Sequence, residues 1–484
     1  MAHEQAKALV RLGHDIRIFA SDPGSSESRH ERTDDLYEGI TIHRIATSPE
    51  DYSPEFLNFL HPRVDTHFHK ILHDFKPDIV HCHNLTGLSV KLPVIARRHG
   101  LRSICTLHDF WGFCLRNTAI RWDGKTCDDI SQCRSCLPRI HDGRKLHVPM
   151  RFRKDFIRLA LDHVDRFIAP SRYIADRYIW AGLHADRLAV LPNGMDIDRF
   201  RSSPRHSSDS IRITYAGYFG AHKGVATLLE AIALLPENRN VTLQLAGEGP
   251  EKAAYLAQIA ALGLGGRVLF LGKIQPADMP GVYAHSDIVV LPSIWEENQP
   301  VCLMEAMAAG LPVAASRKGG IPELIEHGKN GLMFAAGNAG DLALQLTRLI
   351  NDPDLCRRIG REGQRKVEEL THSRQAARQI EIYREVIHSP SPTGKSYDLF
   401  GAAGNLRMKM TGEGKLLPDS EYPTRYFMPH DWIGDCISSF NGVILTGWLW
   451  RAARLLGISP IAVFSSRFRK IGRAMLHRIA RPHP

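Results

Sequence analysis

Residues 287–316, DIVVLPSIWEENQPVCLMEAMAAGLPVAAS, contain the order of elements that decides the fold. The run DIVVLPS is apolar and predicts a strand, IWEENQ predicts a loop, and VCLMEAMAAG predicts a helix. Pro300 suits the first turn of this helix because its missing N–H would have no partner there, and Gly310 is a natural C-terminal cap. LPVAAS then predicts the next strand, so the stretch is a β–α–β unit.

The same alternation extends in both directions along the chain. Short β-rich runs alternate with longer helical stretches up to about residue 200, and a second alternating series follows residue 210. The serine-rich stretch 201–210, RSSPRHSSDS, reads as a linker. Because 484 residues are too many for one core, we predict an α/β fold with two Rossmann-like, doubly wound domains and a cleft between them.

The first of these domains has an unusual start. EQAKALVRLGHD predicts an amphipathic helix that ends at Gly13, and only then does a strand follow. A doubly wound domain normally begins with its central strand and a glycine-rich turn that cradles phosphate. We interpret the domain as truncated at its N-terminus; the alternative is that it has lost a strand.

The alternation stops after about residue 390, and residues 391–484 form an extension. From residue 440 onward this extension carries eight basic residues and no acidic one, and apolar side chains recur at helical spacing. One interpretation is a basic amphipathic helix lying in a membrane interface. The other is a helix packed on the body of the protein with solvated arginines. Arg451 and Arg454 count against a membrane-spanning helix.

The composition of the chain indicates the class of protein and the kind of partner that it binds. Apolar content of 43% and charged content of 24% are those of an ordinary soluble protein. The net charge of +10 favours anionic partners, namely nucleotides, phosphates or an anionic membrane surface, but no nucleic-acid-binding motif is present. The N-terminus lacks an apolar signal region and the nine cysteines are irregularly spaced, so we expect a cytoplasmic protein, free or peripheral on the inner face of the cytoplasmic membrane.

Two carboxylates flank the start of the helix in the opening stretch. The loop delivers Glu297 to the C-terminal edge of a strand, where open α/β sheets bind ligands. Backbone amides near Val301 and Cys302 can hold a phosphate, and Glu305 lies one turn further along on the same side. This set fits a nucleotide sugar; the alternative is two solvated glutamates on an amphipathic helix.

The stretch resembles the E-x7-E signature of retaining GT-B glycosyltransferases of family 4, in its form W-x-E-N-x-P…EA-x-A-x-G-x-P-V. The similarity runs from about residue 4 to about 388 and includes LPNGMDIDRF (191–200), AGEGP (246–250) and GGIPELIEHGKNGLMF (319–334). It implies an acceptor-side domain over 1–200, a nucleotide-sugar-binding domain over 201–372 and a closing helix over 373–390.

The resemblance also implies roles for single residues. Glu297 is expected to contact hydroxyls of the donor sugar, and Glu305 to hydrogen-bond the ribose of the nucleotide. His108, in TLHDFW, is expected to contact the donor sugar and its β-phosphate. The other donor-binding residues implied by the resemblance are Gly217, Gly224, Asn298, Gln299, Val301 and Cys302.

GYFGAHKG (217–224) resembles the family segment whose basic residues grip the diphosphate. Lys223 matches the family pattern and is expected to act in catalysis with Glu297 and His108. Tyr218 stands where the family usually has arginine, which leaves one cation for two phosphates. This departure puts the affinity for the donor in doubt.

Two further groups of side chains are candidates for other roles. His81, His83 and Asn84, in HCHN, are candidates for lining the acceptor cleft. The spacing C-x12-C-x5-C-x2-C offers four thiolates for a structural zinc, with reduced loop thiols as the alternative: Cys114, Cys127, Cys133 and Cys136. The DID at 196–198 lies inside the NGMDIDRF motif, so we assign no catalytic metal and expect no cofactor for the reaction.

The resemblance implies a retaining hexosyl-type glycosyltransferase that uses a UDP- or GDP-sugar donor. The acceptor is expected to be a glycan or lipid-linked hydroxyl, in the biosynthesis of an envelope or extracellular polysaccharide. The alternative from another class is an inactive GT-B protein that binds a nucleotide or a membrane. Tyr218 and the missing first strand both favour that alternative.

Overall fold

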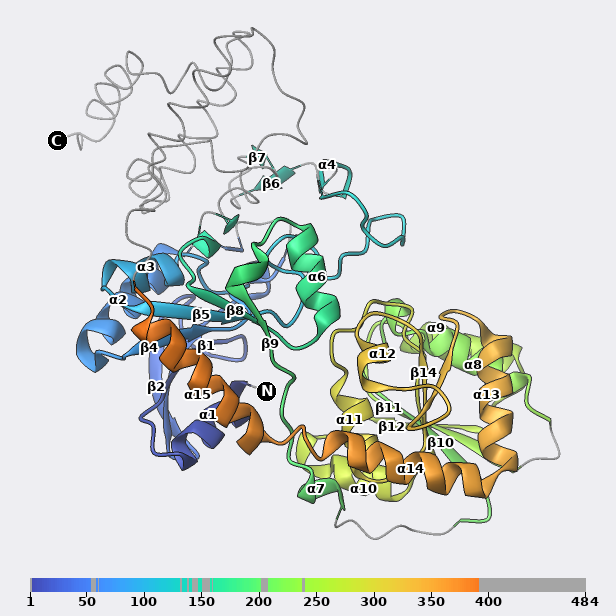
Figure 1. Ribbon diagram of the computed structural model, residues 1–484. Helices are drawn as coiled ribbons and strands as arrows, with labels where there is room; N and C mark the ends of the chain where they lie inside the picture. Colours follow the sequence, from blue (N-terminus) through green and yellow to red (C-terminus); the bar gives the residue numbers. More distant parts are fainter. Residues whose placement is uncertain are drawn as a thin grey trace, which may run out of the picture. The chain divides into compact units, whose positions relative to one another are not determined.

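The computed structural model of the chain describes residues 2–53, 58–59, 61–130, 133–136, 139–141, 147–149, 157–158, 160–201, 208–236 and 240–390 (Figure 1). The chain forms two compact units. Unit 1 comprises Met1–Ile16, Thr106–Phe110 and Arg166–Arg384; unit 2 comprises Arg17–Cys105, Trp111–Asp165 and the chain from Glu385 onward. The predicted extension over 391–484 and most of the predicted linker lie outside the described residues.

Unit 1 is built on a sheet of six parallel strands. In chain order these are β10 (Ile211–Ala216), β11 (Val241–Ala246), β12 (Val268–Gly272), β13 (Ile288–Leu291), β14 (Val313–Ser316) and β15 (Leu332–Phe334). Their spatial order, β12-β11-β10-β13-β14-β15, is the strand order of a doubly wound Rossmann sheet. The alternating series predicted after residue 210, with strands at DIVVLPS and LPVAAS, is confirmed.

Helices cover the sheet in two groups (Figure 1). The first group, in which α8 packs against α9 and α13, consists of α8 (Val225–Ala233), α9 (Lys252–Ala261) and α13 (Ala339–Asn351). In the second group α11 packs against α7 and α14, and α10 also contacts α7. Its members are α7 (Asp198–Arg201), α10 (Met279–Ala284), α11 (Val301–Ala308) and α14 (Pro353–Val367); the short α12 is Ile321–Leu324.

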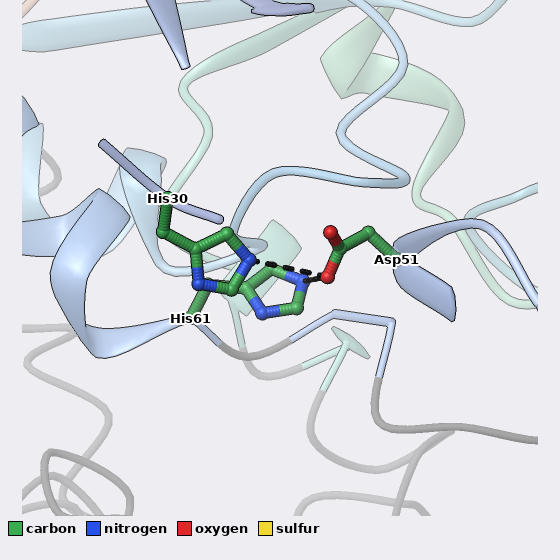
Figure 2. Close-up of side chains that lie close together, drawn as sticks. All are labelled: His30, Asp51 and His61. Carbon is green, nitrogen blue, oxygen red and sulfur yellow. Dashed lines mark hydrogen bonds and ion pairs between the residues drawn. The ribbon is translucent and has the colours of Figure 1, made fainter. Parts of the chain in front are cut away.

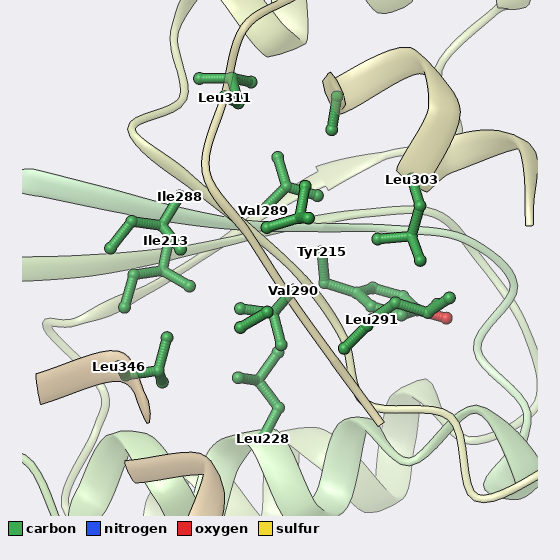
Figure 3. Close-up of a cluster of buried hydrophobic side chains, with 14 of the residues drawn as sticks. Ile213, Tyr215, Leu228, Ile288, Val289, Val290, Leu291, Leu303, Leu311 and Leu346 are labelled. Carbon is green, nitrogen blue, oxygen red and sulfur yellow. The ribbon is translucent and has the colours of Figure 1, made fainter. Parts of the chain in front are cut away.

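The central strand β13 is buried over its whole length, which explains its unbroken apolar sequence. Successive side chains of a strand point to opposite faces of the sheet. Figure 3 shows Val290 directed toward Leu228 of α8 and Val289 on the side of Leu303 of α11. Leu228 and Leu303 are both 0% exposed, so the two groups of helices share one core through this strand.

Helix α11 ends as the sequence predicts and begins one residue later. Gly310 has a left-handed φ of 71°, its N–H donates to Met307 O (2.9 Å), and the N–H of Leu311 donates to Ala306 O (3.0 Å). This is the Schellman pattern of a glycine-terminated helix. Pro300 is extended (φ −73°, ψ 116°) and precedes the helix as its N-cap, so it lies just before the first turn.

The remaining elements of unit 1 come from distant parts of the chain. β8 (Arg166–Ala169) and β9 (Leu188–Val190) pair in parallel, and α6 (Arg172–Trp180) lies between them in sequence. The predicted N-terminal amphipathic helix is α1 (Ala2–Arg11). Its Ala8 and Leu9 pack on Ala376 of α15 (His372–His388), so the two ends of this unit share a small apolar cluster.

Unit 2 contains β1 (Arg17–Asp22), which pairs in parallel with β3 (Ile40–Ala46), and β2 (Arg32–Tyr37), which pairs with β3 in antiparallel orientation. After the short 3-10 helix η1 (Pro49–Asp51) come α2 (Pro62–Phe75), β4 (Ile79–Cys82), α3 (Leu92–Arg98) and β5 (Arg102–Thr106), with β4 parallel to β5. The chain continues through α4 (Cys133–Cys136), β6 (Arg139–His141) and β7 (His147–Pro149). Strand β2, RTDDLY, was not predicted because its side chains are mostly exposed and lack an apolar face.

None of the helices in the described part of the chain combines the length and the apolar character that crossing a membrane requires.

Truncation of a core side chain tests the shared core. Leu228→Ala is expected to lower the free energy of unfolding by about 2–5 kcal/mol, because the lost methyl groups leave a cavity between α8 and β13. Leu344→Ala on α13 is the matched control, since Leu344 is 59% exposed and its loss is expected to change stability by less than about 0.5 kcal/mol. Urea unfolding followed by circular dichroism measures both; equal effects would contradict the core as described.

Candidate functional site

The candidate site in unit 1 lies where the strand order reverses, between β10 and β13. These strands pair in parallel, with Ile213 opposite Ile288, so the loops that follow them leave the same edge of the sheet. The N–H groups of Ile294 and Trp295 both donate to His222 O, at 3.0 and 3.2 Å. The two loops are therefore joined at the point where doubly wound sheets bind their ligands.

Lys223 and Glu297 form an ion pair between these two loops. Lys223 Nζ lies 2.7 Å from Glu297 Oε1, and Ser293 Oγ donates to the same oxygen at 2.8 Å. Glu297 is only 7% exposed, and Lys223 Nζ also lies 4.5 Å from the ring centroid of Trp295. The structure thus brings together a predicted cation and a predicted carboxylate that are 74 residues apart in sequence.

Glu305 lies in α11 and is oriented by a tyrosine. Tyr283 of α10 is buried, and its hydroxyl lies 3.0 Å from Glu305 Oε2 and 3.3 Å from Cys302 O. Burial raises the pKa of Glu305, and the hydrogen bond from Tyr283 acts in the opposite direction. Sequence reasoning missed Tyr283, because no local pattern marks a residue that comes before β13 as a partner of one in α11.

The side-chain amides of Asn298 and Gln299 bind other parts of the chain. Asn298 Oδ1 accepts from Ser171 Oγ at 2.6 Å, and its Nδ2 donates to the backbone oxygens of Leu107 (3.3 Å) and His108 (3.1 Å). Gln299 Oε1 accepts from the N–H of Asn193 at 2.6 Å. Donor binding by these two residues stays a prediction; the observed contacts position neighbouring segments of unit 1.

His108 belongs to the short segment Thr106–Phe110, which is part of unit 1. Its backbone is held to the loop of Glu297 by the Asn298 amide. Burial lowers the pKa of His108 to about 4, so the imidazole is neutral at pH 7. At that pH it can offer hydrogen bonds to a ligand but no charge.

The glycine pair of GGIPEL holds the loop of Glu297 from behind. The N–H of Gly320 donates to Glu297 O at 2.7 Å, and the N–H of Gly319 donates to Glu296 Oε2 at 2.9 Å. Glu296 Oε1 lies 2.9 Å from Lys318 Nζ. A Cβ atom at Gly319 would lie 2.1 Å from Glu297 O, and its φ is +55°, so this close approach requires glycine. Sequence reasoning used the motif but missed Glu296 and Lys318.

Other predicted donor-binding residues sit at the starts of the loops and helices around the ion pair. Gly217 follows β10, and Gly224 (φ +70°) precedes α8, where a Cβ atom would lie 2.0 Å from Pro292 O. Val301 and Cys302 are the first two residues of α11, so their N–H groups lie in its first turn. Burial raises the pKa of the Cys302 thiol to about 12, which keeps it protonated.

The predicted acceptor residues belong to unit 2. The rings of His81, in β4, and His83 are stacked with centroids 4.6 Å apart. Asn84 Oδ1 accepts from the N–H of Thr86 at 2.8 Å, which fixes the turn after the strand. Their role toward an acceptor stays a prediction.

The four predicted zinc-binding cysteines, also in unit 2, line one pocket together with apolar residues such as Phe113 and Ile120. Their thiols are free of disulfides. Two groups of three side chains among the described residues have potential ligand atoms within 4.8 Å of one another, and neither group includes these cysteines. The four thiols line one pocket, but their sulfur atoms are not as close together as the ligands of one zinc ion. Structural zinc at these cysteines stays a prediction.

The geometry agrees with comparisons to known proteins. The family description "Glycosyl transferases group 1" matches residues 196–366, and "Glycosyltransferase Family 4" matches residues 1–199. An uncharacterized glycosyltransferase from Methanocaldococcus jannaschii is 30% identical over 353 residues, which cover 72% of this chain and 83% of that protein. The chain belongs to the glycosyltransferases, and its first 199 residues match the family 4 description.

Other glycosyltransferases show the same relationship at lower identity. The D-inositol 3-phosphate glycosyltransferase of Pseudarthrobacter chlorophenolicus is 26% identical over 403 residues, covering 79% of this chain and 89% of that protein. Sucrose-phosphate synthase of Thermosynechococcus elongatus has a similar structure, with a TM-score of 0.62 at 19% identity, covering 80% of this chain and 93% of that one. HepE of Anabaena, solved with UDP, gives a TM-score of 0.56 at 19% identity, covering 76% and 99%. The predicted α/β GT-B fold is confirmed.

A pair of glycine substitutions tests the close approach behind Glu297. At Gly328 (φ +83°) a Cβ atom would have no other atom within 4 Å, so Gly328→Ala is expected to cost only the left-handed strain, about 1–2 kcal/mol. Gly319→Ala adds the clash with Glu297 O to this strain, so it is expected to lower the free energy of unfolding more than Gly328→Ala does. Urea unfolding of the two variants measures the difference. Equal losses in the free energy of unfolding would show that the loop of Glu297 moves away from the added methyl group at little cost.

Proposed function

We propose that this glycosyltransferase moves a sugar from UDP- or GDP-sugar to an acceptor hydroxyl with retention of the anomeric configuration. The observation that carries the proposal is the Lys223–Glu297 ion pair at the reversal of strand order, beside the start of α11. HepE, which shares the fold, was solved with UDP and with UDP-glucose, which supports a nucleotide-sugar donor.

In this proposal the diphosphate of the donor binds at the N-terminus of α11. The first-turn amides of Val301 and Cys302 offer hydrogen-bond donors and the positive end of the helix dipole. Lys223 Nζ, which lies against Glu297 Oε1 in the structure, supplies the side-chain cation for the same group. Tyr218 is 53% exposed in the same loop and offers a hydroxyl where the family usually offers a guanidinium.

The two carboxylates recognise different parts of the donor. Glu297 is proposed to accept hydrogen bonds from hydroxyls of the sugar through Oε2, because the contacts of Lys223 and Ser293 are both to Oε1. Glu305 is proposed to accept from the ribose hydroxyls, with Tyr283 holding its other contact. His108, neutral at pH 7, is proposed to donate to the sugar or the β-phosphate.

The proposed reaction breaks the bond between the anomeric carbon and the phosphate oxygen and forms a bond to the acceptor oxygen on the same face. The acceptor's proton passes to the departing phosphate oxygen, and a nucleoside diphosphate leaves. Negative charge grows on the diphosphate as the bond breaks, so preorganised positive groups lower the barrier. In this proposal Lys223 and the amides of Val301 and Cys302 supply these positive groups.

We further propose a glycan or lipid-linked acceptor in the synthesis of an envelope or extracellular polysaccharide. The net charge of +10 suits anionic partners such as a lipid-linked diphosphate or an anionic membrane surface.

Titration calorimetry with UDP and with GDP tests the donor site. One of the two nucleotides is expected to bind the wild-type chain, and Glu305→Ala is expected to weaken that binding at least tenfold because the ribose loses its acceptor. Glu326→Ala is the matched control, since Glu326 is an exposed glutamate of unit 1 that pairs with Lys329. Failure of both nucleotides to bind the wild type would favour the inactive, membrane-binding alternative.

Steady-state transfer kinetics at saturating donor test Lys223. Lys223→Ala is expected to lower kcat more than tenfold, or at least about 1.4 kcal/mol in barrier, because the departing diphosphate loses its cation. Lys329→Ala removes an exposed lysine and serves as the control. An unchanged kcat in Lys223→Ala would remove Lys223 from the proposed role.

A further inference from the structure

A second cluster of chemically active side chains lies in unit 2 and includes none of the residues used above. It consists of His30, in the loop before β2, Asp51, at the end of η1, and His61, the N-cap of α2 (Figure 2). Asp51 and His61 are 0% and 4% exposed, and the His30 side chain is 13% exposed. Three segments far apart in sequence thus place two imidazoles and a carboxylate together in a buried position.

The distances within the cluster fit a shared ion better than hydrogen bonds alone. His30 Nε2 lies 3.1 Å and His61 Nε2 lies 3.5 Å from the same atom, Asp51 Oδ1. The longer distance exceeds that of an ordinary hydrogen bond. Two ligand atoms on one tetrahedral zinc, with bonds of about 2.0–2.1 Å, lie about 3.3 Å apart. All three ligand atoms lie within 4.8 Å of one another.

His61 contributes a buried ring nitrogen that faces the carboxylate. Its Nε2 is buried without a hydrogen-bond partner among the described residues, and it lies 3.5 Å from Asp51 Oδ1. A buried polar atom that lacks a hydrogen bond is costly unless another group binds it. A metal ion between Nε2 and Oδ1 would satisfy both atoms.

The charges around Asp51 leave room for a dication. Arg29 donates from Nε to both carboxylate oxygens of Asp51 at 3.1 Å and from Nη2 to Oδ1, and its Nη1 lies 2.9 Å from Glu50 Oε2. One guanidinium therefore faces two carboxylates, so Arg29, Asp51 and the exposed Glu50 together carry a net charge of −1. The N–H and hydroxyl of Ser48 donate to Asp51 Oδ2 at 2.8 and 3.2 Å, so the carboxylate is held with Oδ1 toward the histidines.

We propose that His30, Asp51 and His61 bind a divalent transition metal, with zinc as the ion their chemistry favours. Two imidazoles and one carboxylate are a ligand set that zinc prefers, and the fourth position would hold water. The ion would tie the loop before β2, the end of η1 and the start of α2 into one unit. The site is distinct from the donor site and from the four-cysteine pocket, and its metal would serve the stability of unit 2.

Metal content of the full chain tests the site. The purified chain is stripped with a chelator, dialysed against zinc chloride and analysed by mass spectrometry. His30→Gln and His61→Gln are each expected to lose one bound zinc per chain, whereas the control His73→Gln, at a side chain 81% exposed, keeps it. The double variant Cys133→Ser/Cys136→Ser is expected to keep it as well. His30→Gln guards against a folding failure of His61→Gln, since His30 lies at the rim of the cluster.

Cobalt substitution identifies the ligands by a second readout. Co²⁺ at this site is expected to give visible d–d absorption without the near-ultraviolet thiolate band that cysteine ligands produce. Zinc is expected to raise the thermal midpoint of the wild type and of His73→Gln, and to leave that of the two histidine variants unchanged. Equal zinc content in all variants, or a wild type that binds no metal, would overturn the proposal and leave a hydrogen-bonded cluster around Arg29 and Asp51.

Discussion

The parallel pairing of β10 with β13 is the constraint on which the candidate site depends. The two strands that follow β10 lie on one side of it, in the order β11 and β12, and the strands that follow β13 lie on the other side, in the order β14 and β15. The chain therefore leaves β10 and β13 in opposite directions, and no crossover covers the loops after these two strands. Residues 217–224 and 292–300 meet there because their strands are neighbours, although they are far apart in sequence. The Lys223–Glu297 ion pair follows from this meeting of two loops.

The Lys223–Glu297 ion pair at this point holds two side chains that are also the proposed ligands of the donor. In the described structure Lys223 and Glu297 neutralise each other in a largely buried position, where a lone charge would be costly. A bound diphosphate and sugar would offer each of them a new partner of suitable charge or hydrogen-bonding type. In the proposed function the pair therefore keeps both groups in place before a donor arrives.

The loop of Glu297 is fixed mainly through its backbone and its neighbours. Gly320 binds the carbonyl of Glu297, Glu296 binds Gly319 and Lys318, and Asn298 binds the backbone of His108. Reactive side chains held by such supporting contacts need little reorganisation when a ligand binds. The residues that flank Glu297 therefore help to fix the position of its loop.

The sequence by itself determined the strands of unit 1, the helix that carries Glu305 and its glycine cap, because burial on a parallel sheet and helical periodicity are local patterns. Through the resemblance it also predicted that Lys223 and Glu297 act in one site, and the structure brings the two side chains into an ion pair. The tertiary structure alone decided which polar groups converge: Tyr283 on Glu305, 22 residues away, and His30 with Asp51, 21 residues away. The polar strand β2 was likewise decided by its pairing with β3. Such contacts depend on how separate segments pack, and no period or spacing along the chain encodes them.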